Sequence, residues 1–306
     1  MNNDLPLLSE FFLELEVNNY SEQTIYNYKR DLDTFSTFLD ENDLSFSDLS
    51  KKDLNRFKAD LNSDLSATSV NRTLSCLRTY LSFLNDMDQD IPLPSDAIKL
   101  TKTKKKKPRV PELKKIIELI EFPSEFEDDE RVALRNRAML EVLFSTGLRI
   151  SELIDLDREN IDESGRIFVL GKGKKERFVY LTPRAYNIVE KYLDMRDDDC
   201  PALFIPYSGP KVNQKDKRIS TNYLQMKIKK YRELLNINVP ITAHTIRHAF
   251  ATYMAEEGAN AAASQTMLGH ESLNTTTRYV NTSQRFAEKT HADLHPLKKD
   301  EEGEND

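Results

Sequence analysis

Cysteine is nearly absent from this chain, which carries only Cys76 and Cys200 in 306 residues. Two widely separated cysteines exclude a disulfide framework and a zinc site built on cysteine ligands. The N-terminal Met-Asn-Asn-Asp has neither a basic segment nor an apolar segment, so no secretory signal is expected. We therefore expect a cytoplasmic protein in a reducing compartment.

Long apolar runs are also missing, so we expect no membrane partner. Only 8 glycines and 12 prolines are present, and low complexity is not a general feature of the chain. The glycine-rich stretch Gly171-Lys-Gly-Lys-Lys175 lacks the spacing and the Lys-Ser/Thr ending of a phosphate-binding loop. No cluster of carboxylates, histidines and cysteines has metal-ligand spacing. We expect neither a nucleotide cofactor nor a metal.

Positive charge is in deficit overall, because the formal net charge is −7. The basic residues are nevertheless concentrated in three stretches, Lys102–Arg109, Lys172–Lys175 and Lys211–Arg218. The acidic excess lies largely in the N-terminal third, in Asp197–Asp199 and in the tail Asp300–Asp306. Since binding depends on the local surface rather than on the total, the net charge does not exclude a nucleic-acid partner.

The length predicts two domains, and residues 1–90 have the pattern of a helical bundle. Helices are expected at about 6–17, at 21–40 and from Ser50 to about Leu61. A fourth helix is expected where apolar residues recur at steps of three and four. This apolar stripe consists of Val70, Leu74, Leu77, Leu81 and Leu84. Basic side chains on these helices are candidate phosphate contacts, or simply solvated residues: Lys51, Lys52, Arg56, Lys58, Arg72 and Arg78.

Residues 91–111 differ in character, because four prolines surround a run of lysines and arginine. Proline and like charges favour an extended, unpacked interdomain linker. It is either a solvated tether or a basic strap along a DNA backbone. The lysines proposed to contact DNA here are Lys104, Lys105, Lys106 and Lys107.

Residues 112–296 form the second predicted domain, followed by an acidic, disordered tail at 297–306. A helix at 128–145 should end at Thr146-Gly147, and a short helix should begin at Ser151. Strands at 166–170 and 176–181 predict a β-hairpin with Lys172 at its tip. A strand at Leu203–Pro206 and further helices at 183–196, 219–236, 243–257 and 260–268 complete the pattern. The predicted fold class is mainly α with one small hairpin.

One set of residues in this domain fits chemistry on a phosphodiester. Its members are Arg149, Lys172, His244, Arg247, His270 and Tyr279. His244 and Arg247 are three residues apart in a predicted helix and share one face. Guanidinium groups bind phosphate oxygens, and a tyrosine hydroxyl can attack phosphorus and hold the phosphoryl group covalently. Free tyrosine has a pKa of about 10, so attack at neutral pH requires a base or a cationic pocket.

The same segments resemble the tyrosine recombinase (phage integrase) family in order and spacing over about residues 112–295. Thr146-Gly-Leu-Arg-Ile-Ser-Glu-Leu153 is similar to the motif of the first arginine, which makes Arg149 a catalytic candidate and Glu152 its support. Gly171-Lys-Gly-Lys-Lys-Glu-Arg177 resembles the hairpin of the catalytic lysine. His244-Thr-Ile-Arg247, Leu268-Gly-His270 and Tyr279 match the remaining motifs, with Tyr279 as nucleophile.

The resemblance implies a SAM-like helical domain that grips a core DNA site and a mixed α/β catalytic domain. It implies cleavage through a 3′-phosphotyrosyl link without metal or ATP, by a homo- or hetero-tetramer on two duplexes. The compact length is similar to that of Xer-type members, which resolve chromosome or plasmid dimers, in some cases with a second recombinase or a DNA translocase. Lys174 and Lys175 are further candidates for contacts to double-stranded DNA.

Some positions depart from the family pattern. Val280-Asn281 follows Tyr279 where a histidine often stands, and Ala261-Ala-Ala-Ser264 is plainer than the usual segment. Three alternatives stay open: a mobile-element integrase of the same family, an enzyme similar to type IB topoisomerases, and a DNA-binding module that no longer reacts.

Overall fold

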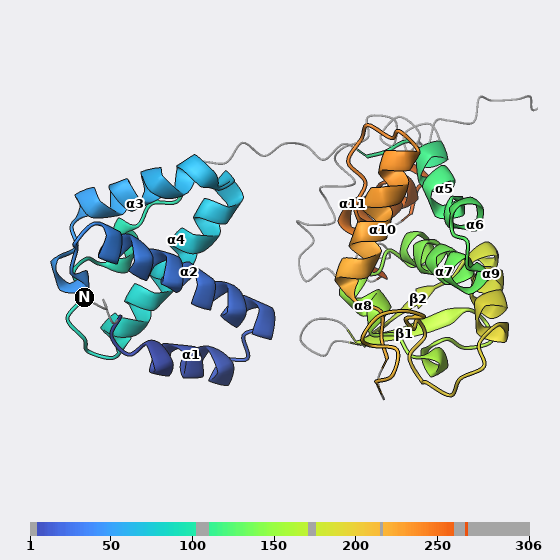
Figure 1. Cartoon of the computed structure of the whole chain (residues 1–306), viewed down its shortest axis with the longest axis horizontal. Helices are drawn as coiled ribbons and strands as arrows, with labels where there is room; N and C mark the ends of the chain where they lie inside the picture. Colours follow the sequence, from blue (N-terminus) through green and yellow to red (C-terminus); the bar gives the residue numbers. More distant parts are fainter. Residues whose placement is uncertain (1–4, 102–109, 171–175, 215–216, 260–266, 269–306) are drawn as a thin grey trace, which may run out of the picture. The chain divides into compact units, whose positions relative to one another are not determined.

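The structure is a computed structural model that describes residues 5–101, 110–170, 176–214, 217–259 and 267–268 (Figure 1). The chain divides into two compact units, Met1–Lys106 and Lys107–Asp306. Helices dominate both units, and the two strands of the described residues form one antiparallel hairpin. The predicted fold class is confirmed.

The N-terminal unit contains the four predicted helices. They are α1 (Leu8–Val17), α2 (Glu22–Glu41), α3 (Lys51–Asp64) and α4 (Ala67–Asp86), with short 3-10 turns η1 (Phe46–Asp48) and η2 (Ser95–Ala97). Ser21 caps α2 by accepting a hydrogen bond from the backbone N–H of Thr24, and Ser50 forms a capping box with Asp53 at α3. The predicted apolar stripe of α4 is buried against α2 and α3.

The predicted linker at 91–111 is wrong in its first half. Ile98 is 3% exposed and belongs to the core of the N-terminal unit, with Ile91 and Leu93 packed against it. The side chain of Asn71 donates to the carbonyl of Thr101 and accepts from its N–H, at 2.9 and 2.7 Å. Burial of these apolar side chains outweighs the extended preference of the prolines. Lys104, Lys105, Lys106 and Lys107 lie outside the described residues.

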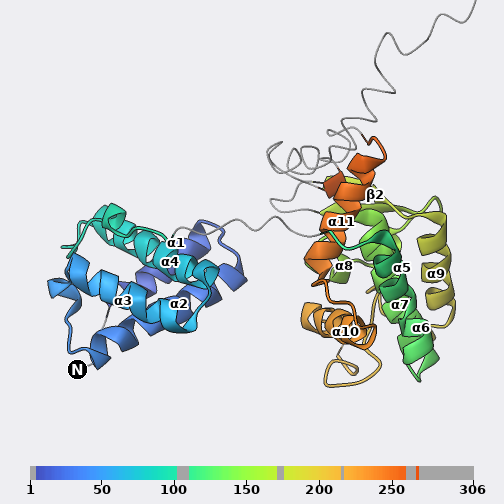
Figure 2. The ribbon, with the colours of Figure 1, turned by 90° about the horizontal axis from the view of Figure 1, so that it is seen from above.

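The C-terminal unit is built around α7 (Glu130–Thr146). Against it pack α5 (Leu113–Glu121), α6 (Pro123–Phe126), α8 (Ile150–Ile154), α9 (Pro183–Asp194) and α11 (Ala243–Glu256). Figure 2 shows α9 beside α7. The unit also contains η3 (Arg158–Asn160) and α10 (Thr221–Leu234), and α10 contacts α5 and α8. Because α7 has buried residues all around its circumference, it positions the helices that carry the candidate site.

The hairpin is confirmed as β1 (Arg166–Leu170) paired with β2 (Glu176–Tyr180). Its turn, with Lys172, Lys174 and Lys175, lies outside the described residues. Gly147 ends α7 in the left-handed region at φ 64°, as the Thr-Gly pair predicted. The helices expected at 128–145, 183–196, 219–236 and 243–257 are present as α7, α9, α10 and α11, whereas α5 and α6 were not predicted.

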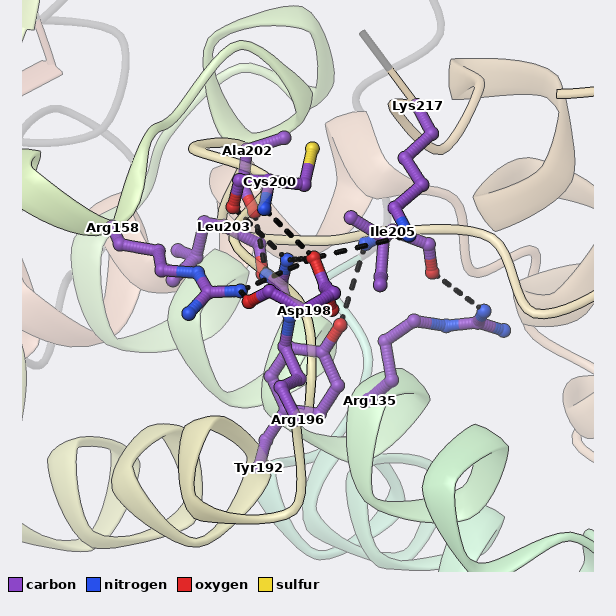
Figure 3. Close-up of polar contacts among 10 residues, drawn as sticks. All are labelled: Arg135, Arg158, Tyr192, Arg196, Asp198, Cys200, Ala202, Leu203, Ile205 and Lys217. Atoms are coloured by element: carbon purple, nitrogen blue, oxygen red, sulfur yellow. Dashed lines mark hydrogen bonds and ion pairs between the residues drawn. The ribbon is translucent and has the colours of Figure 1, made fainter. Parts of the chain in front are cut away.

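The predicted strand at Leu203–Pro206 is wrong, since these residues form no strand and the isolated bridge to Asp157 is made by Ala202, just before the segment. Arginine side chains bind carbonyl groups of this segment (Figure 3), and the backbone N–H of Leu203 donates to the carbonyl of Leu156 at 2.8 Å. Arg196, whose side chain is 0% exposed, donates to the carbonyls of Ala202 and Leu203 at 2.6 and 3.0 Å. The carbonyl of Ile205 accepts from Arg135 at 2.9 Å. The backbone is therefore satisfied without a sheet.

Asp198 anchors the same loop. It forms an ion pair with Arg196 at 2.6 Å, accepts from the N–H of Cys200 at 2.9 Å, and its carbonyl accepts from Arg158 at 2.6 Å. Burial raises the pKa of Asp198, but the hydrogen bond from Arg196 and the other donors outweigh burial and lower it from 3.8 to about 2. At least this member of the acidic run Asp197–Asp199 therefore has a structural role.

Candidate active site

Arg149 is the N-cap residue of α8 and follows the break at Gly147 by two residues. Glu152 holds it twice: one carboxylate oxygen accepts from the Arg149 backbone N–H and the other from Nη1, both at 2.7 Å. The Arg149 side chain is 39% exposed, whereas that of Glu152 is 8% exposed. The buried carboxylate thus orients a guanidinium that still reaches solvent.

Glu152 also forms an ion pair with a second arginine. Arg177 donates from Nη1 and Nη2 to the two carboxylate oxygens at 3.0 and 2.8 Å, in a bidentate pair. Nη1 of Arg247 lies 3.8 Å from the same carboxylate. Burial raises the pKa of Glu152, but the hydrogen bonds from Arg177 and Arg149 outweigh it, so the pKa lies below its usual value. Glu152 is ionised at neutral pH.

Arg247 lies on α11 and is 6% exposed. Its Nη1 donates to the carbonyl of Gly147 at 2.7 Å and its Nη2 to that of Leu268 at 2.5 Å. One side chain thus joins α11, the end of α7 and the segment at 267–268. The structure brings Arg149, Glu152 and Arg247 together, although about 100 residues separate the first two from the third.

His244 lies in the first turn of α11 and is exposed. The hydroxyl of Thr242 caps this turn by accepting from the N–H of Thr245 at 3.1 Å. Arg247 follows His244 by three residues, as predicted for one helix face. His248 is partly buried, its Nδ1 lies 3.3 Å from the hydroxyl of Thr252, and burial together with the charge of His244 lowers its pKa.

Arg177 is the residue that sequence reasoning missed. The sequence shows it only as the last residue of the hairpin motif, yet its side chain is 6% exposed. Arg177 alternates with Val179 on the inward face of β2 and lies opposite Val169 in the register. A charged side chain at an inward position of an amphipathic strand was the available signal, because such a group is stable only with a partner.

The remaining predicted site residues lie outside the described residues. These are Lys172, Lys174, Lys175, His270 and Tyr279. Within the described parts of the chain, no three or more histidine, cysteine, aspartate or glutamate side chains are grouped so as to hold a metal ion. None of the described helices is both long and apolar enough to cross a membrane.

The described site has one dominant electrostatic feature. Three guanidinium groups, from Arg149, Arg177 and Arg247, surround a single carboxylate. The positive charges exceed the negative one, so this cluster attracts an anion such as a phosphate group, and Arg149 is its exposed member.

Two family models match nearly the whole chain. Residues 92–285 match the phage integrase family, and residues 8–87 match the phage integrase N-terminal SAM-like domain. The chain is 32% identical to tyrosine recombinase XerC of Leptospira interrogans over 93% of this chain and 91% of the relative. It is also 32% identical to tyrosine recombinase XerD of Staphylococcus epidermidis over 93% of this chain and 96% of the relative.

Solved structures show the same fold. The XerH site-specific recombinase bound to palindromic difH substrate, in a post-cleavage complex, has a TM-score of 0.72 and 22% identity. That match covers 90% of this chain and 81% of the other. A lambda integrase (75–356) dimer bound to a COC′ core site has a TM-score of 0.71 at 16% identity, covering 91% of this chain and 95% of the other.

Proposed function

The chain belongs to the phage integrase family of tyrosine recombinases, and we propose that it is a Xer-type site-specific recombinase that cuts and rejoins double-stranded DNA. The observation that carries the proposal is the convergence of Arg149, Arg177 and Arg247 on Glu152. Relatives named XerC and XerD match 93% of the chain, which favours this role over that of a mobile-element integrase.

In the proposed reaction, the hydroxyl of Tyr279 attacks the scissile phosphorus. The new bond is a 3′-phosphotyrosyl link, and the bond that breaks releases a 5′-hydroxyl. Arg149 and Arg247 stabilise the charge that develops on the nonbridging oxygens. His244 assists proton movement at the nucleophile, Lys172 protonates the leaving oxygen, and His270 donates to the phosphoryl group.

The energy of the broken bond is retained in the phosphotyrosyl link. A 5′-hydroxyl from a second duplex reverses the first step and exchanges strands without ATP. The arginines supply the positive charge that a divalent cation supplies in other phosphoryl transfers, so no metal is required.

The assembly that this reaction needs is a tetramer of identical or paired recombinases on two duplexes, acting to resolve chromosome or plasmid dimers. We propose a DNA-core-binding domain, which the packing of Ile98 and the contacts of Thr101 extend from residue 90 to about residue 101, and a catalytic domain at 112–296. Lys104, Lys105, Lys106, Lys107, Lys174 and Lys175 are the proposed backbone contacts. Whether a second recombinase or a translocase takes part is tested by adding host extract to the assay below.

A covalent-trapping assay tests the proposed chemistry. The protein is incubated with duplexes from its own genome that carry a nick beside the scissile position, with EDTA and without ATP, and adducts are separated on denaturing gels. A DNA–protein adduct that is absent with Tyr279→Phe is the expected result. DNA binding without an adduct, even with host extract present, would identify a non-reacting DNA-binding module instead.

A further inference from the structure

We propose that Arg177 is a positioning residue for DNA-strand cleavage. From β2 it fixes the carboxylate that orients Arg149, and it holds the backbone segment that leads to His270. This inference rests on the proposed recombinase function. It adds a residue that does not itself touch the DNA in the mechanism above.

The first observation is the number and direction of the hydrogen bonds that Arg177 donates. Nη1 and Nη2 donate to the two oxygens of Glu152 at 3.0 and 2.8 Å, and Nε donates to the carbonyl of Met267 at 2.9 Å. The side chain is 6% exposed, so water does not replace these contacts easily. Only a guanidinium has donors in this planar arrangement, and lysine cannot reproduce it.

The second observation is that Arg177 connects three segments of the site. It belongs to β2, it binds the carboxylate of α8, and it binds the carbonyl of Met267. The next carbonyl, of Leu268, is held by Arg247. Two buried arginines therefore donate hydrogen bonds to consecutive carbonyl groups, which immediately precede Gly269-His270 in the sequence.

The third observation concerns Glu152, whose two oxygens each accept one hydrogen bond from Arg149 and one from Arg177. Burial alone favours the protonated acid, and Arg177 is the main group that opposes it. A protonated carboxyl has one oxygen occupied by hydrogen and cannot accept from both Nη1 and the backbone N–H of Arg149 in the same way. Without Arg177, the guanidinium of Arg149 is therefore no longer held in one orientation, and its orientation depends on pH through the protonation of Glu152.

The test compares Arg177→Gln and Arg177→Lys with the control Arg166→Gln. Arg166 lies on the adjacent strand, is half-exposed and pairs with Asp162 at 2.9 Å, so the control removes an arginine ion pair from the same hairpin. Single-turnover formation of the Tyr279 adduct on the nicked duplex is measured from pH 5.5 to 8.5. Affinity for the same duplex and the melting temperature are measured in parallel.

We expect Arg177→Gln to slow cleavage by about 100-fold at pH 7, the loss typical of a displaced reacting geometry, while DNA affinity changes little. Its cleavage rate should rise with pH over a range in which the wild type and Arg166→Gln are flat, because deprotonation of Glu152 restores the contact to Arg149. Arg177→Lys should recover part of the rate and reduce the pH dependence, since it restores the charge but not the fork.

The proposal is overturned if folded Arg177→Gln cleaves as fast as Arg166→Gln, or if its loss is equal at every pH. If Arg177→Gln does not fold, Arg177→Lys decides: wild-type rate and wild-type pH profile in that variant overturn the proposal. A wild-type protein that gives no adduct would instead refute the recombinase function itself. The two failures are therefore distinguishable.

Discussion

At the scale of single residues, buried arginines connect segments that are distant in sequence. Arg135, Arg177, Arg196 and Arg247 are each almost inaccessible, and each donates to at least one backbone carbonyl. A guanidinium has five donors in a fixed plane, so one side chain can satisfy a loop backbone and a carboxylate together. In the described residues of the unit that carries the candidate site, buried arginines therefore satisfy loop carbonyls that would otherwise need a further strand.

Replacing Arg247 by lysine should affect chemistry more than binding. The single nitrogen of an ammonium lacks the planar fork that reaches the carbonyls of Gly147 and Leu268 from two nitrogens while the group faces the phosphate, so the rate of adduct formation should fall on the order of 100- to 1000-fold. The measurement is single-turnover cleavage, with Arg232→Lys on α10 as a control for the same exchange away from the site. An equal effect of both variants would contradict a role for Arg247 in the reaction.

Asp198 should make stability depend on pH only in the acid range. Its folded pKa of about 2 lies below the usual value, so its contribution is complete above about pH 4 and is lost as the pH falls toward 2. Asp198→Asn should lower the free energy of unfolding by about 1–2 kcal/mol at neutral pH, after allowance for solvent screening. Chemical denaturation from pH 2 to 7 checks this, and a deficit that does not shrink in acid would refute it.

At the scale of elements, the end of α7 fixes the geometry of the site. The chain reverses at Gly147, whose carbonyl binds Arg247, and Arg149 then begins α8. The apolar ring of Phe250 on α11 closes over the glycine. A residue with a Cβ cannot occupy this position unless the ring of Phe250, α11 or the turn moves, so a glycine here keeps the helix end and α11 in place.

Gly147→Ala should therefore be strongly destabilising. Its φ of 64° disfavours a side chain, and an added Cβ would lie 2.4 Å from Cδ1 of Phe250. We expect a loss of at least about 2 kcal/mol in the free energy of unfolding, from backbone strain together with the clash. Guanidinium denaturation measures it.

Gly209→Ala is the matched control for this prediction. Gly209 also has a positive φ, 91°, but no atom lies within 4 Å of the added Cβ. This variant measures the cost of the positive φ alone, without a clash between the added Cβ and a neighbouring side chain. Equal losses in the two variants would show that Phe250 moves aside at no cost.

At the scale of the whole molecule, charge is distributed unevenly. The net charge is −7, yet the site concentrates three guanidinium groups and the chain has separate basic runs. Local concentrations of positive charge attract a polyanion in spite of an acidic total, because salt screens distant charges within about 10 Å. Affinity for DNA should consequently depend on particular segments rather than on the total charge.

Changing Lys104, Lys105, Lys106 and Lys107 together to glutamine tests the largest such segment. If each lysine neutralises a phosphate, the slope of log affinity against log salt should decrease by about 3 to 4. The loss should be similar on specific and non-specific duplexes, because phosphate contacts carry no sequence information. Titrations at several salt concentrations measure it, and an unchanged slope would identify the segment as a solvated tether.

The sequence by itself determined most of the local structure and the family. Ser21 and Ser50 mark helix starts, Gly147 marks a helix end, and the alternation around residues 166–180 marks the hairpin. Each of these signals acts over about four residues, through capping, turn geometry or side-chain periodicity. The order and spacing of the motifs then identified the tyrosine recombinase family, which the comparisons confirm.

Only the tertiary structure decided which residues distant in sequence are in contact. It buried Ile98 in the N-terminal core, replaced the expected strand at Leu203–Pro206 by arginine contacts, and placed Arg177 on Glu152, 25 residues away. Such contacts depend on the desolvation of groups that meet after folding, and neighbouring residues do not encode that cost. The sequence therefore gives the site's candidate residues, and folding selects the partners that orient them.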